Sequence, residues 1–179
     1  MITAVGIKKL YYAETSAVTG DLTGAMLKTI LETAKEVKNV HQDTWNIDEA
    51  DPSITNYKNQ LSKQTYRQTK ELGDVVMNFT IGQYDYDTKA DLMGGEAIKR
   101  TGESVGWKRA RGNVNINNCL IAKTEDDVWI VFPKGSVVAR EANTDGAIGI
   151  AVSGTSLEPE NTDIAPEYWF DDSEVNTEV

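Results

Sequence analysis

The longest apolar run of the chain, VWIVF at 128–132, has the length of a single β-strand. Its continuous apolar character indicates a strand that is buried on both faces. Pro133 follows the run and is expected to close it, and the acidic residues 125–127 before it predict the turn of a hairpin. No apolar run approaches the length needed to span a membrane, so we expect no membrane partner.

Further strand patterns surround this run. Residues 75–81 alternate apolar and polar side chains, and segments 6–13, 114–121, 136–141 and 147–153 also favour strands. Apolar residues recur at helical spacing over 22–37, and 87–93 predicts a short helix that ends at Gly94 and Gly95. Close strand spacing with hairpin-type turns predicts a mainly β fold, an antiparallel β-sandwich or barrel with one or two flanking α-helices. We expect residues 1–179 to form a single domain.

Residues 41–70 are polar and lack a strong apolar pattern. Segments 53–57 and 64–67 are compatible with two short strands, so we expect an extended polar loop or a long hairpin. A polar excursion of this length is unusual inside a compact domain and tends to be either disordered or used for binding.

The net charge of −10 is concentrated near the end of the chain. The acidic C-terminal segment, 158–179, contains eight acidic residues and no lysine or arginine. One interpretation is a solvated and partly frayed tail. The other is a charged arm that docks on a neighbouring molecule. The opening residues do not have the pattern of a signal peptide, and one cysteine cannot form an intrachain disulfide, so a cytoplasmic origin is expected.

Motifs for chemistry are weak. Residues 102–106 match G-x-S-x-G, but the preceding segment 96–100 is too charged for the buried strand of a nucleophile elbow, and we expect a flexible glycine-rich loop. Residues 85–96 partly match a calcium loop, yet Lys89 occupies a ligand position, so helix N-terminal acids are the simpler interpretation. His41 and Cys119 are single residues of their kind, and a Cys–His pair is only a formal possibility. We therefore predict no enzyme, no catalytic residue, no cofactor and no metal site.

Five basic residues surround Trp107, namely Lys99, Arg100, Lys108, Arg109 and Arg111. Three interpretations remain open. They are contact with nucleic acid, a solvated loop, and a basic loop of one subunit facing the acidic C-terminal segment of the next.

The opening VGIKKLYYA at 5–13 resembles the start of long-tailed phage major tail tube proteins. The order of the later pieces is also similar: a long polar excursion, a strand leading into an acidic short helix with a double glycine over 79–95, a hairpin over 121–132, and a final strand pair ending at 157–159. The likeness covers about residues 5–170 and lies in layout rather than in a diagnostic motif.

The resemblance implies a β-sandwich subunit that closes into hexameric rings, related in architecture to secretion-system tube proteins. Stacked rings would form a virion tail tube that conducts DNA without specific binding, after assembly in the bacterial cytoplasm with further copies and other tail proteins. In that family an extended loop reaches the next ring, and the segment around 45–66 is the candidate here.

The expected self-assembly interface comprises Trp45, Ile54, Tyr57, Leu61, Tyr66, Lys99, Arg100, Lys108, Arg109 and Arg111. The alternative function is a non-catalytic β-sandwich binding module for carbohydrate or protein. It is motivated by the four tryptophans, which in exposed positions stack on sugars.

Overall fold

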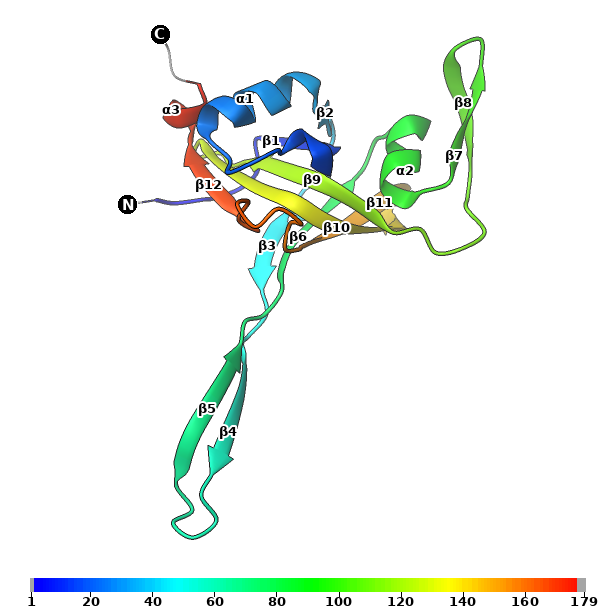
Figure 1. The fold of residues 1–179 in the computed structure, drawn as a ribbon. Coiled ribbons are helices and arrows are strands. Elements are labelled where there is room, and N and C mark those ends of the chain that lie inside the picture. Colours follow the sequence, from blue (N-terminus) through cyan, green and yellow to red (C-terminus); the bar gives the residue numbers. More distant parts are fainter. Residues whose placement is uncertain (1, 177–179) are drawn as a thin grey trace.

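A computed structural model describes residues 2–176, and it consists mainly of antiparallel strands (Figure 1). Within these residues the largest sheet has eight strands. They are β1 (Lys9–Glu14), β2 (Lys35–Glu36), β3 (Asn46–Glu49), β6 (Val75–Ile81), β9 (Ile116–Lys123), β10 (Val128–Thr144), β11 (Ala147–Ser156) and β12 (Tyr168–Asp171). The strand order is β2-β1-β9-β10-β11-β6-β3, with β12 beside β10. The path has two ends, so the sheet is open rather than closed into a barrel.

Two further pairs of strands stand apart from this sheet. One is β4 (Ser53–Lys58) with β5 (Thr65–Glu71), and the other is β7 (Glu96–Arg100) with β8 (Glu103–Lys108). The helices are α1 (Gly24–Thr33), α2 (Tyr86–Met93) and the short α3 (Asp172–Val175), with a single 3-10 turn at Thr15–Ala17. The prediction of a mainly β, antiparallel fold with flanking helices is confirmed.

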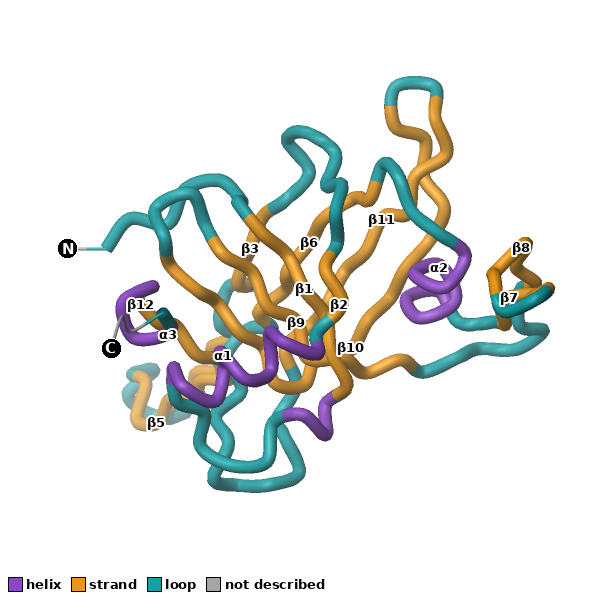
Figure 2. The backbone as a smooth tube through the Cα atoms, turned by 90° about the horizontal axis from the view of Figure 1, so that it is seen from above, coloured by secondary structure: helices purple, strands orange, loops and turns teal. Residues whose placement is uncertain are grey.

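β9 and the first part of β10 are buried on both faces, as the apolar run predicts, whereas the second half of β10 has exposed residues. Side chains of one face, such as Leu120 and Ile130, join a cluster with residues of β1, β6 and β11. Side chains of the other face, such as Ile121 and Trp129, join a second cluster beneath α1. Seen from above, α1 lies across the strands β1 and β9, while α2 lies near the far end of β10 (Figure 2).

Capping side chains determine where α1 and α2 begin. The Thr23 side chain accepts a hydrogen bond from the Met26 amide and caps α1, which buries Leu27 and Ile30. This helix ends earlier than the periodicity predicts, because residues 35–36 form β2 and pair with β1 instead. Asp85 caps α2 by accepting a hydrogen bond of 2.7 Å from the Thr88 amide. Asp85 and Asp87 therefore serve the helix start, as expected, whereas Asp91 accepts a hydrogen bond from Tyr12 and Glu96 lies in β7.

Pro133 does not end the strand, contrary to the prediction. β10 continues to Thr144, and its register with β9 shifts between Phe132 and Gly135. A bulge tolerates proline because the ladder is already interrupted where the missing N–H would have to donate. The first part of β10 pairs with β9 and β12, and its second part pairs with β11, so the long strand connects these strands in one sheet.

Candidate functional site

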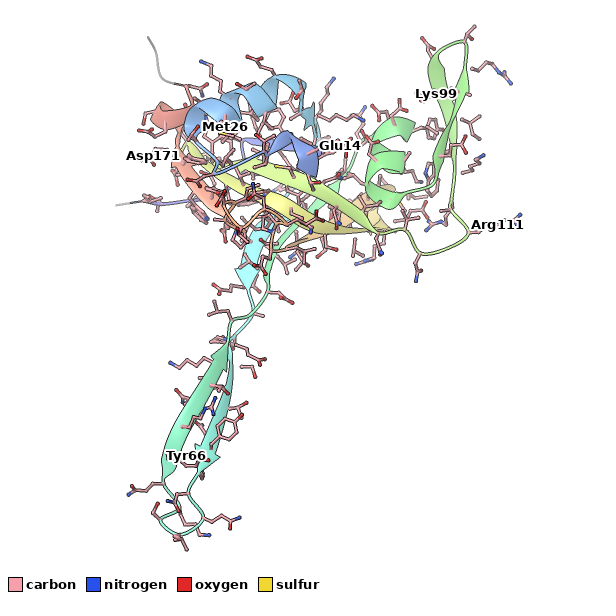
Figure 3. All side chains as sticks on the ribbon, in the orientation of Figure 1. Glu14, Met26, Tyr66, Lys99, Arg111 and Asp171 are labelled. Atoms are coloured by element: carbon pink, nitrogen blue, oxygen red, sulfur yellow. The ribbon has the colours of Figure 1, made fainter. Side chains whose placement is uncertain are left out.

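Two hairpins project from the body in opposite directions, and they carry seven of the ten residues of the expected interface (Figure 3). The first hairpin, here named the arm, is formed by β4, β5 and their connecting turn. The second hairpin is formed by β7 and β8. Arg109 and Arg111 lie in the loop after β8. Trp45 packs against the body core just before β3, and its Nε1 atom is buried. The side chain is therefore partly covered by its own chain, and its place in a self-assembly interface stays a prediction.

The arm continues the strands of the body. β3 pairs with β6. Just beyond this pair, Ser53 at the start of β4 lies opposite Glu71 at the end of β5. Every residue of β4 is exposed, and β5 has only Thr69 partly covered. The polar stretch 41–70 thus contains β3, which belongs to the main sheet, and most of a hairpin that packs against nothing in its own chain.

Polar contacts across the strands hold the arm. Gln68 donates a hydrogen bond of 2.9 Å to Asn56 on one face, and the Arg67 guanidinium lies 5.5 Å from the Tyr57 ring on the other. At the tip, the Asn59 side chain accepts hydrogen bonds from two backbone amides. Isolated two-stranded hairpins are marginal in water. The arm therefore has a defined shape but no core of its own.

The arm also exposes apolar side chains. Leu61 is 95% exposed at the tip and Leu72 is 85% exposed at the base, while Ile54, Tyr57 and Tyr66 are exposed between them. Apolar groups that gather on one projecting element mark an interaction surface. The expected interface does not include Leu72, which lies beyond the polar stretch 41–70.

A narrow neck joins the arm to the body. The Ala50 amide donates a hydrogen bond of 3.0 Å to the Asp74 carbonyl oxygen. A Cβ atom at Gly73 would lie 1.8 Å from the Ala50 carbonyl oxygen, so the two chains meet there without room for a side chain. Glycine at position 73 is thus required by close backbone approach.

The second hairpin replaces the flexible loop that was expected around 102–106. Its two-residue turn places Thr101 and Gly102 at positive φ angles of 51° and 88°, which suits a tight hairpin turn. Ser104 lies in β8 and its hydroxyl donates a hydrogen bond of 2.8 Å to Asp87. Because the serine follows a hairpin turn and sits in an exposed strand pair, the nucleophile-elbow geometry is not formed.

Trp107 attaches this hairpin to α2. Its indole Nε1 donates a hydrogen bond of 2.9 Å to the Gly94 carbonyl, and Lys89 and Arg109 lie 4.4 and 5.3 Å from its ring. Glu141 of β10 accepts from Lys89 at 2.8 Å and lies 3.3 Å from Arg109. Hydrogen bonding and charge from Lys89, helped by the charge of Arg109, lower the pKa of Glu141. Trp107 is therefore a packing residue and not a free stacking surface.

The five basic residues differ in how they are paired. Lys108 lies 2.7 Å from Glu96 and Arg109 pairs with Glu141, whereas Lys99 lies 4.0 Å from Asp87. Among residues 2–176, Arg100 and Arg111 form no ion pair with an acidic side chain. The residues available for an external anion are thus Lys99, Arg100 and Arg111.

The acidic C-terminal segment is folded against its own body as far as residue 176, so the expectation of a frayed tail is wrong for those residues. Docking of the segment on a neighbouring molecule stays a prediction. β12 pairs with β10, and Val175 is 1% exposed. Asp172 accepts hydrogen bonds from Lys123 at 2.8 Å and from the Trp129 indole at 2.7 Å. Residues 177–179 lie outside the described part of the chain.

The remaining candidates for chemistry are dispersed. Cys119 is fully buried in the cluster beneath α1, and burial raises the pKa of its thiol to about 12. His41 instead lies 3.2 Å from Asp145, so the two residues do not form a Cys–His pair. Within the described residues, no three His, Cys, Asp or Glu side chains gather as a metal site. Of the four tryptophans only Trp169 is strongly exposed, at 47%, and the exposed tyrosines Tyr57, Tyr66 and Tyr86 lie on other elements.

Charge divides sharply between the hairpins and the rest. Residues 53–71 hold four basic and one acidic side chain, and residues 96–111 hold five basic and two acidic side chains. The rest of the chain therefore has nine basic and twenty-five acidic residues. Both projecting elements are basic, and the body from which they project is strongly acidic.

No protein-family model matches this sequence, and a search of curated proteins found no match. No helix in residues 2–176 combines the length and the apolar character needed to cross a membrane.

Proposed function

We propose that this protein is a structural subunit that assembles with further copies of itself through its arm, as a tail tube subunit of a phage or prophage does. The observation that carries the proposal is the arm itself. Its two strands bury no side chain, yet they hold exposed apolar groups well away from the body. A second copy is the simplest partner that would cover these groups.

Charge supports the same proposal. A basic arm and an acidic body complement each other between copies, and this complementarity favours association while disfavouring contact between two arms. An acidic body also suits a conduit for DNA, because a basic lumen would retain phosphates. In this proposal the chain acts without catalysis, its partners are its own copies and other tail proteins, and it resides in the virion tail.

Assembly of the purified protein tests the proposal. Light scattering after gel filtration and negative-stain microscopy are expected to show rings or tubes that grow with concentration. A variant in which residues 51–73 are replaced by Asn-Gly is expected to remain a monomer, because Ala50 and Asp74 are already adjacent. A wild-type protein that stays monomeric at every concentration would refute the proposal.

A further inference from the structure

A second contact between copies follows from where the charges lie along the main sheet. Figure 3 shows Lys99 and Arg111 at one side of the body and Asp171 at the opposite side. β9 runs between these sides, and its eight residues span about 26 Å at the usual rise of a strand. The charges are therefore separated by about the width of the body.

The basic side, here named the basic pole, consists of Lys99, Arg100 and Arg111. Lys99 and Arg100 belong to β7 and lie next to its turn, and all three side chains are exposed. Trp107 and its hydrogen bond to Gly94 fix the hairpin that presents Lys99 and Arg100, and Arg111 lies in the loop that follows β8. Because Arg100 and Arg111 have no acidic partner among the described residues, their charges are free to meet an external surface.

The acidic side, here named the acidic pole, lies at the other end of the sheet. The Asp172 amide donates a hydrogen bond of 3.0 Å to the Asp127 carbonyl oxygen, so the turn 125–127 and the start of α3 lie side by side. The acidic residues gathered there are Glu125, Asp126, Asp127, Asp171, Asp172 and Glu174. Lys8 and Lys123 pair with Asp127, and Lys123 also pairs with Asp172. Glu125, Asp126, Asp171 and Glu174 form no ion pair with the described basic residues.

We infer that the basic pole of one copy docks against the acidic pole of the next, in a head-to-tail lateral contact. An end-on contact about a two-fold axis would place a pole against its own kind, which like charges oppose. A head-to-tail contact instead joins unlike poles at every step, and it closes into a ring or continues as a filament. This inference rests on the proposed self-assembly and adds a contact that does not involve the arm.

A charge-swap experiment tests the contact. The variant Arg100→Glu with Arg111→Glu has two acidic poles, and the variant Asp171→Lys with Glu174→Lys has two basic poles. Neither pair removes a side-chain hydrogen bond within the described residues. Each variant alone is expected to need about tenfold more protein, or more, for half-complete assembly. An equimolar mixture is expected to assemble, because every junction then joins unlike poles.

Controls separate this contact from folding and from the arm. Arg100→Lys with Arg111→Lys keeps the charge and is expected to assemble like the wild type. Raising the salt concentration from about 0.05 M to about 0.5 M is expected to weaken wild-type assembly, because the exposed poles are screened. Protection of the buried Cys119 thiol from labelling reports that each variant is folded.

The outcomes are distinguishable. If the wild type assembles and both reversed variants assemble equally well, or if the mixture fails to restore assembly, the pole contact is overturned while the arm-based assembly stands. If the basic-pole variant assembles normally but loses binding to duplex DNA, the basic pole is a nucleic-acid surface and the contact is again overturned. A wild type that never assembles refutes both proposals.

Discussion

Gly73 approaches Ala50 so closely that a Cβ atom at position 73 would lie 1.8 Å from the Ala50 carbonyl oxygen. Gly73→Ala is therefore expected to force the two chains of the neck apart. The free energy of unfolding should fall by about 1–3 kcal/mol, and amide exchange should quicken in β4 and β5 before it does in β9 and β10. Gly112→Ala is the matched control, because nothing lies within 4 Å of its added Cβ. Equal effects of the two substitutions would contradict this account of the neck.

Removal of the arm is expected to leave the body intact. No arm residue is buried, so replacing residues 51–73 by Asn-Gly should change the midpoint of thermal unfolding by only a few degrees, by about the amount that 1 kcal/mol produces. Calorimetry at a concentration where the wild type is monomeric measures this change. Loss of the cooperative transition would show that the arm supports the fold.

The carboxyl of Asp172 makes stability depend on acidity. Burial acts to raise its pKa, but hydrogen bonds from Lys123 and Trp129, together with the Asn176 amide, outweigh burial and leave the pKa below the ordinary value. A lowered pKa in the folded state stabilises the protein above the unfolded-state value of about 3.9, and this stabilisation is lost as the pH falls through the folded-state pKa. Urea unfolding between about pH 6 and pH 3 should show that loss, and Asp172→Asn should flatten the slope.

Lys123 pairs with Asp127 and Asp172 and thereby stabilises the contact between the turn 125–127 and α3. Burial acts to lower its pKa, but hydrogen bonds to Asp127 and Asp172 outweigh burial and raise it. Lys123→Met leaves the half-buried Asp172 without its cation, so the free energy of unfolding should fall by about 2 kcal/mol or more. A double-mutant cycle with Asp172→Asn measures the coupling of the pair, and additive effects would contradict it.

Glu141 is expected to hold the second hairpin in place. Glu141→Gln removes the charge that Lys89 and Arg109 share, so amide exchange in β7 and β8 should become faster and Trp107 fluorescence should change. Glu103→Gln is the matched control, since Glu103 lies on the same hairpin and pairs with no described basic side chain. Equal effects of the two variants would show that Glu141 has no special role.

The reactivity of Cys119 measures how often the core beneath α1 opens to solvent. Its thiol is fully buried and its pKa is raised to about 12 by burial, so the reactive thiolate is scarce at neutral pH. Labelling by a thiol reagent should therefore be slow in the native protein and fast in denaturant. Rapid labelling of the native protein would contradict the packing of α1 over β9.

Strands with a strong hydrophobic pattern are predictable from this sequence, whereas strands with exposed or charged side chains are not. The alternation over 75–81 coincides with β6, and the apolar run at 128–132 lies in β10 and is buried on both faces. The second hairpin escaped prediction because Glu96 and Lys99 make β7 look like a loop, although exposed strands tolerate such charge. The folded C-terminal segment escaped as well, because its acidic composition conceals the buried Val175 and the pairing of β12.

The candidate site was predicted in part. The arm residues Ile54, Tyr57, Leu61 and Tyr66 and the basic residues after Gly95 were expected at the surface and are exposed, because apolar side chains in a polar stretch and clustered basic side chains can be recognised in the sequence. The sequence did not predict that these residues lie on two elements at opposite sides of the body, because this depends on the order of the strands in the sheet. Trp45 was assigned to the interface because it begins the polar segment 45–66, whereas in space it packs partly buried against the body core.

The continuity between arm and body has a mechanical consequence. Because the arm joins the body through β3 and β6, a pull on its tip reaches the ladder between β6 and β11 along the strand direction. Such a load shears several backbone hydrogen bonds together instead of opening them one after another, so it meets high resistance. An arm without a core can therefore act as a tether under tension, with its anchor in the main sheet of the body.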